Sequence, residues 1–221
     1  MKHVAIIVAS GSGSRYHSTI PKQFTHINNK MVLEYTIEKF MNIVDKIIIM
    51  VHQDYQKSMV QYFSHLSNIQ ICIGGKSRQE SVLNGLKYLQ KHTPDIVTIH
   101  DSVRPLVSQN MILDSLATAL KYNSAIPIIP IVDSLWQKNE THTLSTSCDR
   151  NLFVCSQTPQ AFNYKQILQA HMHAEDILSQ FSDCAGVYTN LFHNVHTYEG
   201  NKNNIKLTTT DDLAFIKFSL H

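Results

Sequence analysis

The chain has 221 residues, of which 43% are hydrophobic, and its 19 lysines and arginines are nearly balanced by 17 aspartates and glutamates. This length supports one sizeable core, and no linker-like or charge-rich block divides the chain, so we expect a single domain. A net charge of +2, with scattered basic residues, lacks the footprint of a nucleic-acid-binding protein. We find no secretory leader and no apolar run of roughly 18 residues, which predicts a cytoplasmic protein.

The first predicted strand, Val4–Val8, is a continuous apolar run, which is typical of a strand buried on both faces of a parallel sheet. Gly11 and Gly13 follow it, and glycines allow unusual backbone angles and let peptide N–H groups approach a ligand. Arg15 and Lys22 then add a planar and a compact positive charge. The loop therefore predicts a phosphate-binding site, with a plain strand-to-helix turn as the structural alternative.

Two familiar glycine loops do not fit this stretch. A dinucleotide-binding fingerprint needs a third glycine three residues after the second, and Tyr16 stands there. A nucleotide-triphosphatase phosphate loop needs glycine, lysine and a hydroxyl residue in succession, whereas Lys22 follows a proline.

Predicted helices and strands then alternate. Helical spacing of apolar residues is found over 31–43, about 54–65, 82–89 and 108–121, and strand-like runs over 46–51, 69–73 and 96–99. This alternation predicts an α/β fold with a mainly parallel sheet, in which ligands bind outside the carboxyl ends of the strands. Charged turns at two further strand ends, 74–81 and 100–105, are therefore expected to meet the glycine loop at one edge.

The last third of the chain is less regular. Residues 125–136 read as extended, and Pro127 and Pro130 favour an edge or irregular strand. The polar segment at about 136–157 lacks helical periodicity, which indicates an arm. Helices are expected at about 163–176 and 182–191, then a strand at 194–199. Thr209 or Thr210 is expected to cap a last helix, with Asp211 and Asp212 in its first turn. Its inward residues are predicted to be Leu213, Phe215, Ile216 and Leu220.

Four cysteines, Cys72, Cys148, Cys155 and Cys184, show no Cys-x-x-Cys spacing. They suggest neither a zinc site nor a disulfide framework. We expect them to be small core residues.

A series of motifs spans nearly the whole chain: Gly-Ser-Gly-x-Arg with Pro-Lys-Gln, Gly-Gly-x-x-Arg-Gln-x-Ser, His-Asp-x-x-Arg-Pro, Pro-x-x-Asp-Ser, Asp-Arg, Gln-Thr-Pro-Gln-Ala-Phe and Asn-Ile-Lys-x-Thr with a later Asp-Leu. In this order they resemble the 2-C-methyl-D-erythritol 4-phosphate cytidylyltransferase family. Ribitol-5-phosphate cytidylyltransferases share the same skeleton and remain an alternative. A non-catalytic nucleotide-binding homologue is a second one.

The resemblance implies a single-domain, Rossmann-like nucleotidyltransferase fold with a protruding arm. It also implies transfer of CMP from CTP to a small alditol phosphate, with release of pyrophosphate. Catalysis would then depend on alignment and positive charge, which Arg15, Lys22 and Lys206 would supply. Mg²⁺ or another divalent cation is expected on the phosphates, with Asp101 near it or near a substrate hydroxyl.

The resemblance also implies two groups of binding residues. The nucleotide would be contacted by Ala9, Ser10, Gly11, Gly13, Gly75 and Ser81. The acceptor would be contacted by Asp101, Arg104, Ser134 and Arg150. Arg150 lies in the arm, which in this family crosses to a partner subunit, so a homodimer with shared acceptor sites is expected. Nucleic-acid and membrane partners are not.

Overall fold

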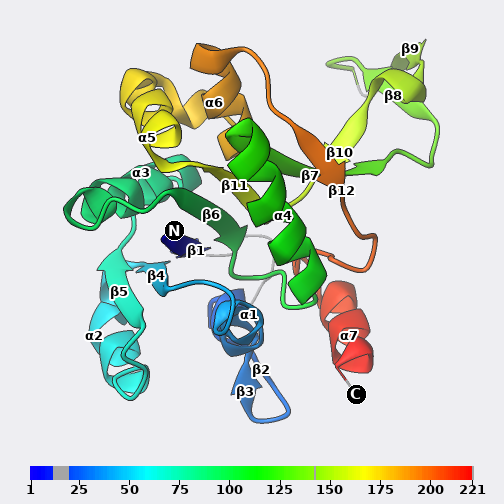
Figure 1. The fold of residues 1–221 in the computed structure, drawn as a ribbon. Helices are drawn as coiled ribbons and strands as arrows, with labels where there is room; N and C mark the ends of the chain where they lie inside the picture. The colour runs from blue at the N-terminus through cyan, green and yellow to red at the C-terminus, as the bar shows by residue number, and fades with distance from the viewer. Residues whose placement is uncertain (12–19, 142, 221) are drawn as a thin grey trace.

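Within residues 1–11, 20–141 and 143–220, which the computed structural model describes, an eight-stranded sheet runs in the order β10-β7-β11-β6-β1-β4-β5, with β12 beside β7 (Figure 1). Its strands are β1 (His3–Ala9), β4 (Lys46–Val51), β5 (Ile69–Ile73), β6 (Ile96–Asp101), β7 (Ser124–Pro130), β10 (Val154–Ser156), β11 (Gln160–Asn163) and β12 (Thr197–Glu199). Neighbouring strands are parallel from β6 through β1 and β4 to β5, and β12 is parallel to β7. Only β10 and β11 run antiparallel among these strands. The predicted α/β class with a mainly parallel sheet is confirmed.

Helices cover both faces of the sheet. They are α1 (Val32–Phe40), α2 (Gln53–Tyr62), α3 (Arg78–Tyr88), α4 (Gln109–Tyr122), α5 (Tyr164–His173), α6 (Cys184–Phe192) and α7 (Thr210–Ser219). Alternate residues of β1 explain the layers. Ala5 and Ile7 join a core cluster with α1, α2 and α4, whereas Val4 and Ile6 join a cluster with α3, α5 and α6. Both faces of β1 are thus buried, as its continuous apolar run predicted.

Strand β7 differs from the expectation of an edge strand. It pairs with β11, β10 and β12, so the edge prediction is wrong. The expectation of irregularity is met. The chain advances five residues from Ser156 to Ala161, whereas the opposing stretch of β7, from Ala125 to Ile128, advances only three. A break in register near Pro127 accommodates a residue that cannot donate a ladder hydrogen bond.

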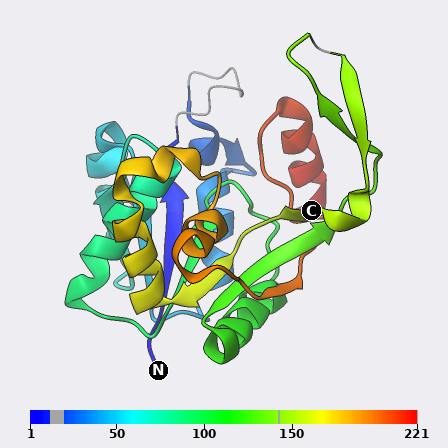
Figure 2. The same cartoon turned by 90° about the horizontal axis from the view of Figure 1, so that it is seen from above.

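The predicted arm is a separate two-stranded sheet, β8 (Leu135–Lys138) and β9 (Leu144–Cys148), followed by the 3₁₀ helix η3 (Arg150–Leu152). Viewed from above, it stands away from the body of the molecule (Figure 2). A second small hairpin, β2 (His26–Ile27) and β3 (Lys30–Met31), turns through Asn28 and Asn29, which both have positive φ. Such angles suit a tight primed turn and are tolerated well by asparagine.

The last helix begins as expected and packs differently in one detail. Thr209 accepts from the Asp212 N–H, and the Asp212 carboxylate accepts from the Thr209 N–H, which completes a capping box. Ile216 is fully buried, whereas Phe215 is 41% exposed, so its predicted inward position is wrong. The 3.6-residue period places adjacent residues about 100° apart, so the two cannot face the core equally.

The cysteines are all reduced, and only Cys184 among them is fully buried. Cys72 is half-buried and packs against the core, whereas Cys148 lies in the strand Leu144–Cys148 of the arm and Cys155 on β10 is exposed. The core prediction is therefore wrong for Cys148 and Cys155. Among the described helices, none is long and apolar enough to cross a bilayer.

Candidate active site

The carboxyl ends of β1, β5 and β6 open on one pocket of about 810 Å³. The residues predicted for the site that line it are Ser10, Gly11, Lys22, Gly75, Asp101 and Lys206. The three turns singled out in the sequence therefore meet, as expected for a parallel sheet. His52 and Gln53, after β4, complete the same edge and were not predicted.

The side chain of Gln23 holds the loop after β1 in place. Its buried side-chain amide donates to the carbonyl of Ala9 at 2.8 Å and to that of Gly11 at 3.0 Å. Gln23 lies in the 3₁₀ helix η1 (Lys22–Phe24), and this tether places the preceding Lys22 at the pocket wall. Gly13 and Arg15 lie outside the described residues.

The turn after β5 is joined to the first loop by Ser81. Its Oγ lies 2.7 Å from Oγ of Ser10 and accepts from the N–H of Gly75 at 2.9 Å. A Cβ on Gly74 would lie 2.6 Å from Cβ of Ser10, so only glycine allows this approach. A Cβ on Gly11, in contrast, would meet none of the described residues within 4 Å. Ser81 is fully buried and does not line the pocket, so its contact with nucleotide stays a prediction.

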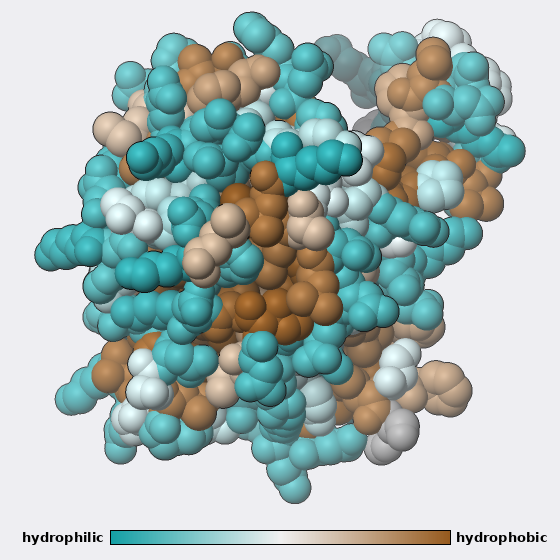
Figure 3. Space-filling view, in the orientation of Figure 1, coloured by the Kyte–Doolittle hydropathy of each residue, from teal (hydrophilic) through white to brown (hydrophobic). Residues whose placement is uncertain are grey.

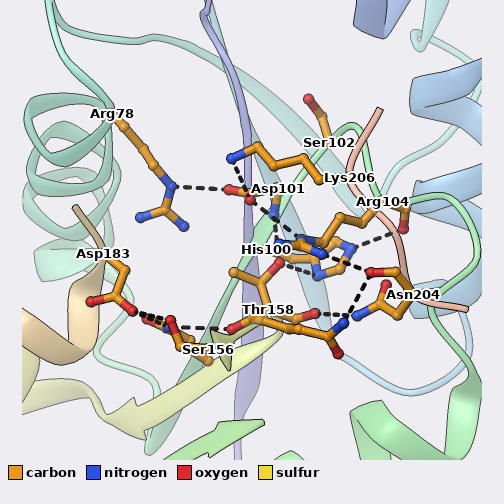
Figure 4. A network of polar contacts seen from close by, with 12 residues as sticks. Arg78, His100, Asp101, Ser102, Arg104, Ser156, Thr158, Asp183, Asn204 and Lys206 are labelled. Atoms are coloured by element: carbon orange, nitrogen blue, oxygen red, sulfur yellow. Dashed lines mark hydrogen bonds and ion pairs between the residues drawn. The ribbon is translucent and has the colours of Figure 1, made fainter. Parts of the chain in front are cut away.

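Asp101, the last residue of β6, is surrounded by three positive side chains (Figure 4). Its Oδ1 accepts from Nε of Arg78 at 2.9 Å, and its Oδ2 lies 2.9 Å from Nζ of Lys206. Nε of Arg104 lies 3.5 Å from the same Oδ2. Three positive charges therefore face one buried negative charge, which leaves a local excess suited to an anionic ligand.

The charges of this cluster are fixed by mutual interaction. Burial by itself raises the pKa of Asp101, but Arg78, Lys206 and Arg104 outweigh burial and hold that pKa well below its ordinary value of 3.8. For Arg104 the effect of burial is the larger, and its pKa falls below its ordinary value despite Asp101. Asp101 is ionised at neutral pH, and both arginines remain charged.

Arg78 is a site residue that the sequence reasoning missed. It stands first in α3 and comes from the Gly-Gly-x-x-Arg-Gln-x-Ser motif, so the motif held the signal. Its Nη1 donates to Sγ of the buried Cys184 at 3.4 Å, while its Nη2 is buried without a hydrogen-bond partner among the described residues. The side chain is 22% exposed and lines the pocket. It therefore faces both the carboxylate and the cavity.

Three further polar residues lie beneath Asp101 and were also missed. They are His100, Thr158 and Asn204, all of them buried. Figure 4 shows them linked to Arg104 and to one another by hydrogen bonds. Each belongs to a sequence motif, but buried contacts between distant segments cannot be read from motif spacing.

The predicted acceptor residues fall into two places. Arg104 lies beside Asp101, and its Nη1 donates to the carbonyl of Asn204 at 2.7 Å. Ser134 and Arg150 lie at the base of the arm, exposed, and neither lines the pocket. Arg150 donates through Nη1 to the carbonyl of Val132. Among the described residues, one chain thus brings Ser10, Gly11 and Gly75 of the predicted nucleotide set to the pocket, but not the whole acceptor set.

Comparison with known proteins agrees with this arrangement. A family model described as 2-C-methyl-D-erythritol 4-phosphate cytidylyltransferase matches residues 3–221. The enzyme of that name from Petrotoga mobilis is 39% identical over 220 residues, which cover 96% of each chain. That from Thermosipho melanesiensis is 34% identical and covers 97% of this chain and 96% of its own.

A solved structure extends the likeness to three dimensions. The crystal structure of the Francisella tularensis 2-C-methyl-D-erythritol 4-phosphate cytidylyltransferase superposes with a TM-score of 0.86 at 27% identity, covering 99% of both chains. The motifs, the pocket that they build and these full-length matches lead to one conclusion. The chain belongs to the 2-C-methyl-D-erythritol 4-phosphate cytidylyltransferase family.

Proposed function

We propose that this chain transfers CMP from CTP to the phosphate of 2-C-methyl-D-erythritol 4-phosphate and releases pyrophosphate, a step of isoprenoid precursor synthesis. The observation that carries the proposal is the excess of positive charge at Asp101, in a pocket that Lys22 also lines. A triphosphate and a sugar phosphate are the kind of anions that such a pocket attracts. Family membership favours this acceptor over D-ribitol 5-phosphate.

The reaction needs no nucleophile from the protein. An oxygen of the acceptor phosphate, already an anion, forms a bond to the α-phosphorus of CTP. The bond from that phosphorus to the bridging oxygen breaks, and its electron pair leaves with pyrophosphate. The protein has to align the two phosphates and neutralise the charge that gathers on the pentavalent phosphorus.

We assign this neutralisation to Lys22 and Lys206, which reach the pocket from opposite ends of the chain. Arg15, the third predicted cation, belongs to the same role. Lys206 is 37% exposed, whereas Arg78 and Arg104 are more deeply buried. Lys206 is therefore the partner of Asp101 that can turn towards a phosphate, because the two arginines keep the carboxylate paired.

The divalent cation is best treated as part of the CTP substrate. Mg²⁺ commonly takes one or two carboxylates together with substrate phosphates. Asp101 is a poor resident ligand, because three positive side chains, Arg78, Arg104 and Lys206, already surround its two oxygens and repel a metal cation. Glu80, the other acid at the pocket, accepts from the N–H of Lys76. No group of three potential metal ligands occurs among the described residues.

We further propose that the acceptor site is completed by a second copy of the chain. Hydrophobic side chains gather on the arm and where it joins the body (Figure 3). Exposed large hydrophobic residues of this region are Val132, Trp136, Leu144, Leu152, Phe153 and Val154. Such an exposed apolar patch is typical of an interaction surface. Arg150 and Ser134 at its base would then serve the pocket of the partner.

The direct test of the proposed function is release of pyrophosphate from CTP in the presence of this acceptor. D-ribitol 5-phosphate, tested side by side, separates the two cytidylyltransferase alternatives. Equilibrium binding of CTP without turnover on either acceptor would support a non-catalytic nucleotide-binding protein.

A further inference from the structure

A chain of buried hydrogen bonds joins three separate segments beneath Asp101 (Figure 4). The segments are the end of β6 with the turn that follows it, the Gln157–Gln160 motif, and the stretch before α7 that carries Lys206. His100 and Asn204 are fully buried, and Thr158 is 4% exposed. These residues lie under the pocket rather than in its wall.

The hydrogen bonds define the state of the His100 ring. Oγ1 of Thr158 accepts from the N–H of Asp101 at 3.1 Å, so its own hydrogen can be given to Nδ1 of His100, 3.0 Å away. Nδ1 is then an acceptor, and the ring hydrogen lies on Nε2, which donates to the carbonyl of Arg104 at 3.2 Å. The ring is neutral in this arrangement, and burial agrees by lowering the pKa of His100 to about 3.

Asn204 links the other side of the network. The side-chain amide of Asn204 donates to the backbone carbonyl of Thr158 at 2.8 Å, and the backbone carbonyl of Asn204 accepts from Nη1 of Arg104 at 2.7 Å. Three residues later, the N–H of Leu207 donates to the carbonyl of Val103 at 2.9 Å. Lys206 thus lies between two points at which its segment is fastened to the turn after β6.

We infer that His100 and Asn204 are positioning residues of this site. His100 fixes the turn that carries Asp101 and Arg104, and Asn204 fixes the segment of Lys206 to that turn and to Thr158. Neither touches the substrate; both set where the ammonium group of Lys206 stands relative to Asp101. This inference rests on the role of Lys206 in the proposed function.

The first test is a double-mutant cycle on the full-length protein. Asn204→Ala should lower kcat by about 10- to 100-fold, because a displacement near 1 Å costs about that much, and should change KM for CTP by less than about threefold. In a Lys206→Met background the same change should lower kcat by less than about threefold, because the group that Asn204 positions is gone. Asn203→Ala, at the exposed neighbouring asparagine, is the matched control.

If Asn204→Ala lowers kcat by the same factor in the unchanged protein and in Lys206→Met, the inference is overturned, because a residue that only stabilises the fold has the same effect whether or not Lys206 is present. An unchanged kcat in the single variant would do the same.

The second test uses the unmodified protein and does not depend on turnover. Nitrogen NMR of ¹⁵N-histidine-labelled protein at pH 7, with His100 assigned by comparison with His100→Gln, should show Nδ1 without hydrogen and Nε2 with it. Hydrogen on Nδ1, or on both nitrogens, would contradict the network even in a fully active enzyme. If the protein shows this tautomer but no transfer of CMP, the network stands and the proposed function fails.

Discussion

Nζ of Lys206 lies 2.9 Å from Oδ2 of Asp101, so a lysine from the stretch before α7 meets the carboxylate at the end of β6. The same carboxylate holds Arg78 and Arg104. In the proposed mechanism Lys206 leaves this pairing to meet a phosphate. Hydrogen bonds of Asn204 and Leu207 hold the backbone on either side of Lys206. Replacing the Lys206 side chain therefore tests its charge specifically.

Lys206→Met should lower kcat for CMP transfer by about 100- to 1000-fold, the usual cost of one lost group that stabilises transition-state charge. The free energy of unfolding should change little, because Arg78 and Arg104 still pair with Asp101. Steady-state kinetics and urea unfolding measure the two effects. Lys202→Met, at an exposed lysine of the preceding turn, is the control and should behave like the unchanged protein. Near-normal turnover of Lys206→Met would refute the assigned role.

Asp101→Asn should be most destabilising at neutral pH. The pKa of Asp101 in the folded protein is held well below 3.8, so its contribution is present above the ordinary pKa and is lost as pH falls below it. Leaving three cations without their carboxylate should cost about 3–5 kcal/mol of unfolding free energy at pH 7. Urea unfolding at pH 7, 5, 4 and 3 should show a difference in unfolding free energy from the unchanged protein that is nearly constant between pH 7 and 5 and narrows below about pH 4. A difference that stays constant would contradict the ion cluster.

Gly74→Ala should destabilise the fold by about 1–3 kcal/mol, the usual cost of an overpacked contact, because its Cβ would lie 2.6 Å from Cβ of Ser10. Gly11→Ala is the matched control, since a Cβ there meets none of the described residues within 4 Å. Thermal and urea unfolding, which need no ligand, compare the two variants. Equal stability of both would show that the two loops do not pack as described.

Arg150→Ala should weaken use of the acceptor much more than binding of CTP, because Arg150 does not line the pocket that holds Ser10, Gly11 and Gly75. If each acceptor site takes Arg150 from the partner, mixing inactive Lys22→Ala and Arg150→Ala chains should restore activity. Random exchange gives up to about a quarter of the full rate, since half of the dimers are mixed and each has one intact site. Sedimentation checks that dimers form.

Mixed chains that remain inactive, although they exchange subunits, would show that Arg150 serves its own pocket. A fully active monomer at micromolar concentration would exclude the shared site altogether.

The sequence predicted those parts of the fold whose signal is local. The run at 46–51 became β4, because buried parallel strands are nearly continuously apolar. The isoleucine-rich run at 69–73 became β5, a less buried strand at the edge of the sheet. The meeting of three charged turns followed from the topology of parallel sheets, without knowledge of any contact. The start of α7 was predicted from capping chemistry alone, by Thr209 and Asp212.

Features that depend on distant partners were missed or misjudged. The prolines of β7 favoured an edge or irregular strand. It is not an edge strand, because β12, the last strand in the chain, pairs with the side of β7 that β10 and β11 leave open. Arg78 stood in a recognised motif, yet its contact with Asp101 depends on how α3 is placed against β6. Nothing in the sequence indicates that His100 and Asn204 are connected through Thr158 and Arg104, because a buried hydrogen bond leaves no periodicity in the sequence.

The central claim is tested most directly by measuring pyrophosphate release with CTP and Mg²⁺, comparing 2-C-methyl-D-erythritol 4-phosphate with D-ribitol 5-phosphate at equal concentrations. We predict a kcat/KM at least about tenfold higher for the first acceptor, since hydroxyl groups that a site is built to bind discriminate strongly. Preference for ribitol 5-phosphate, or no release with either acceptor while CTP still binds, would contradict the proposed function.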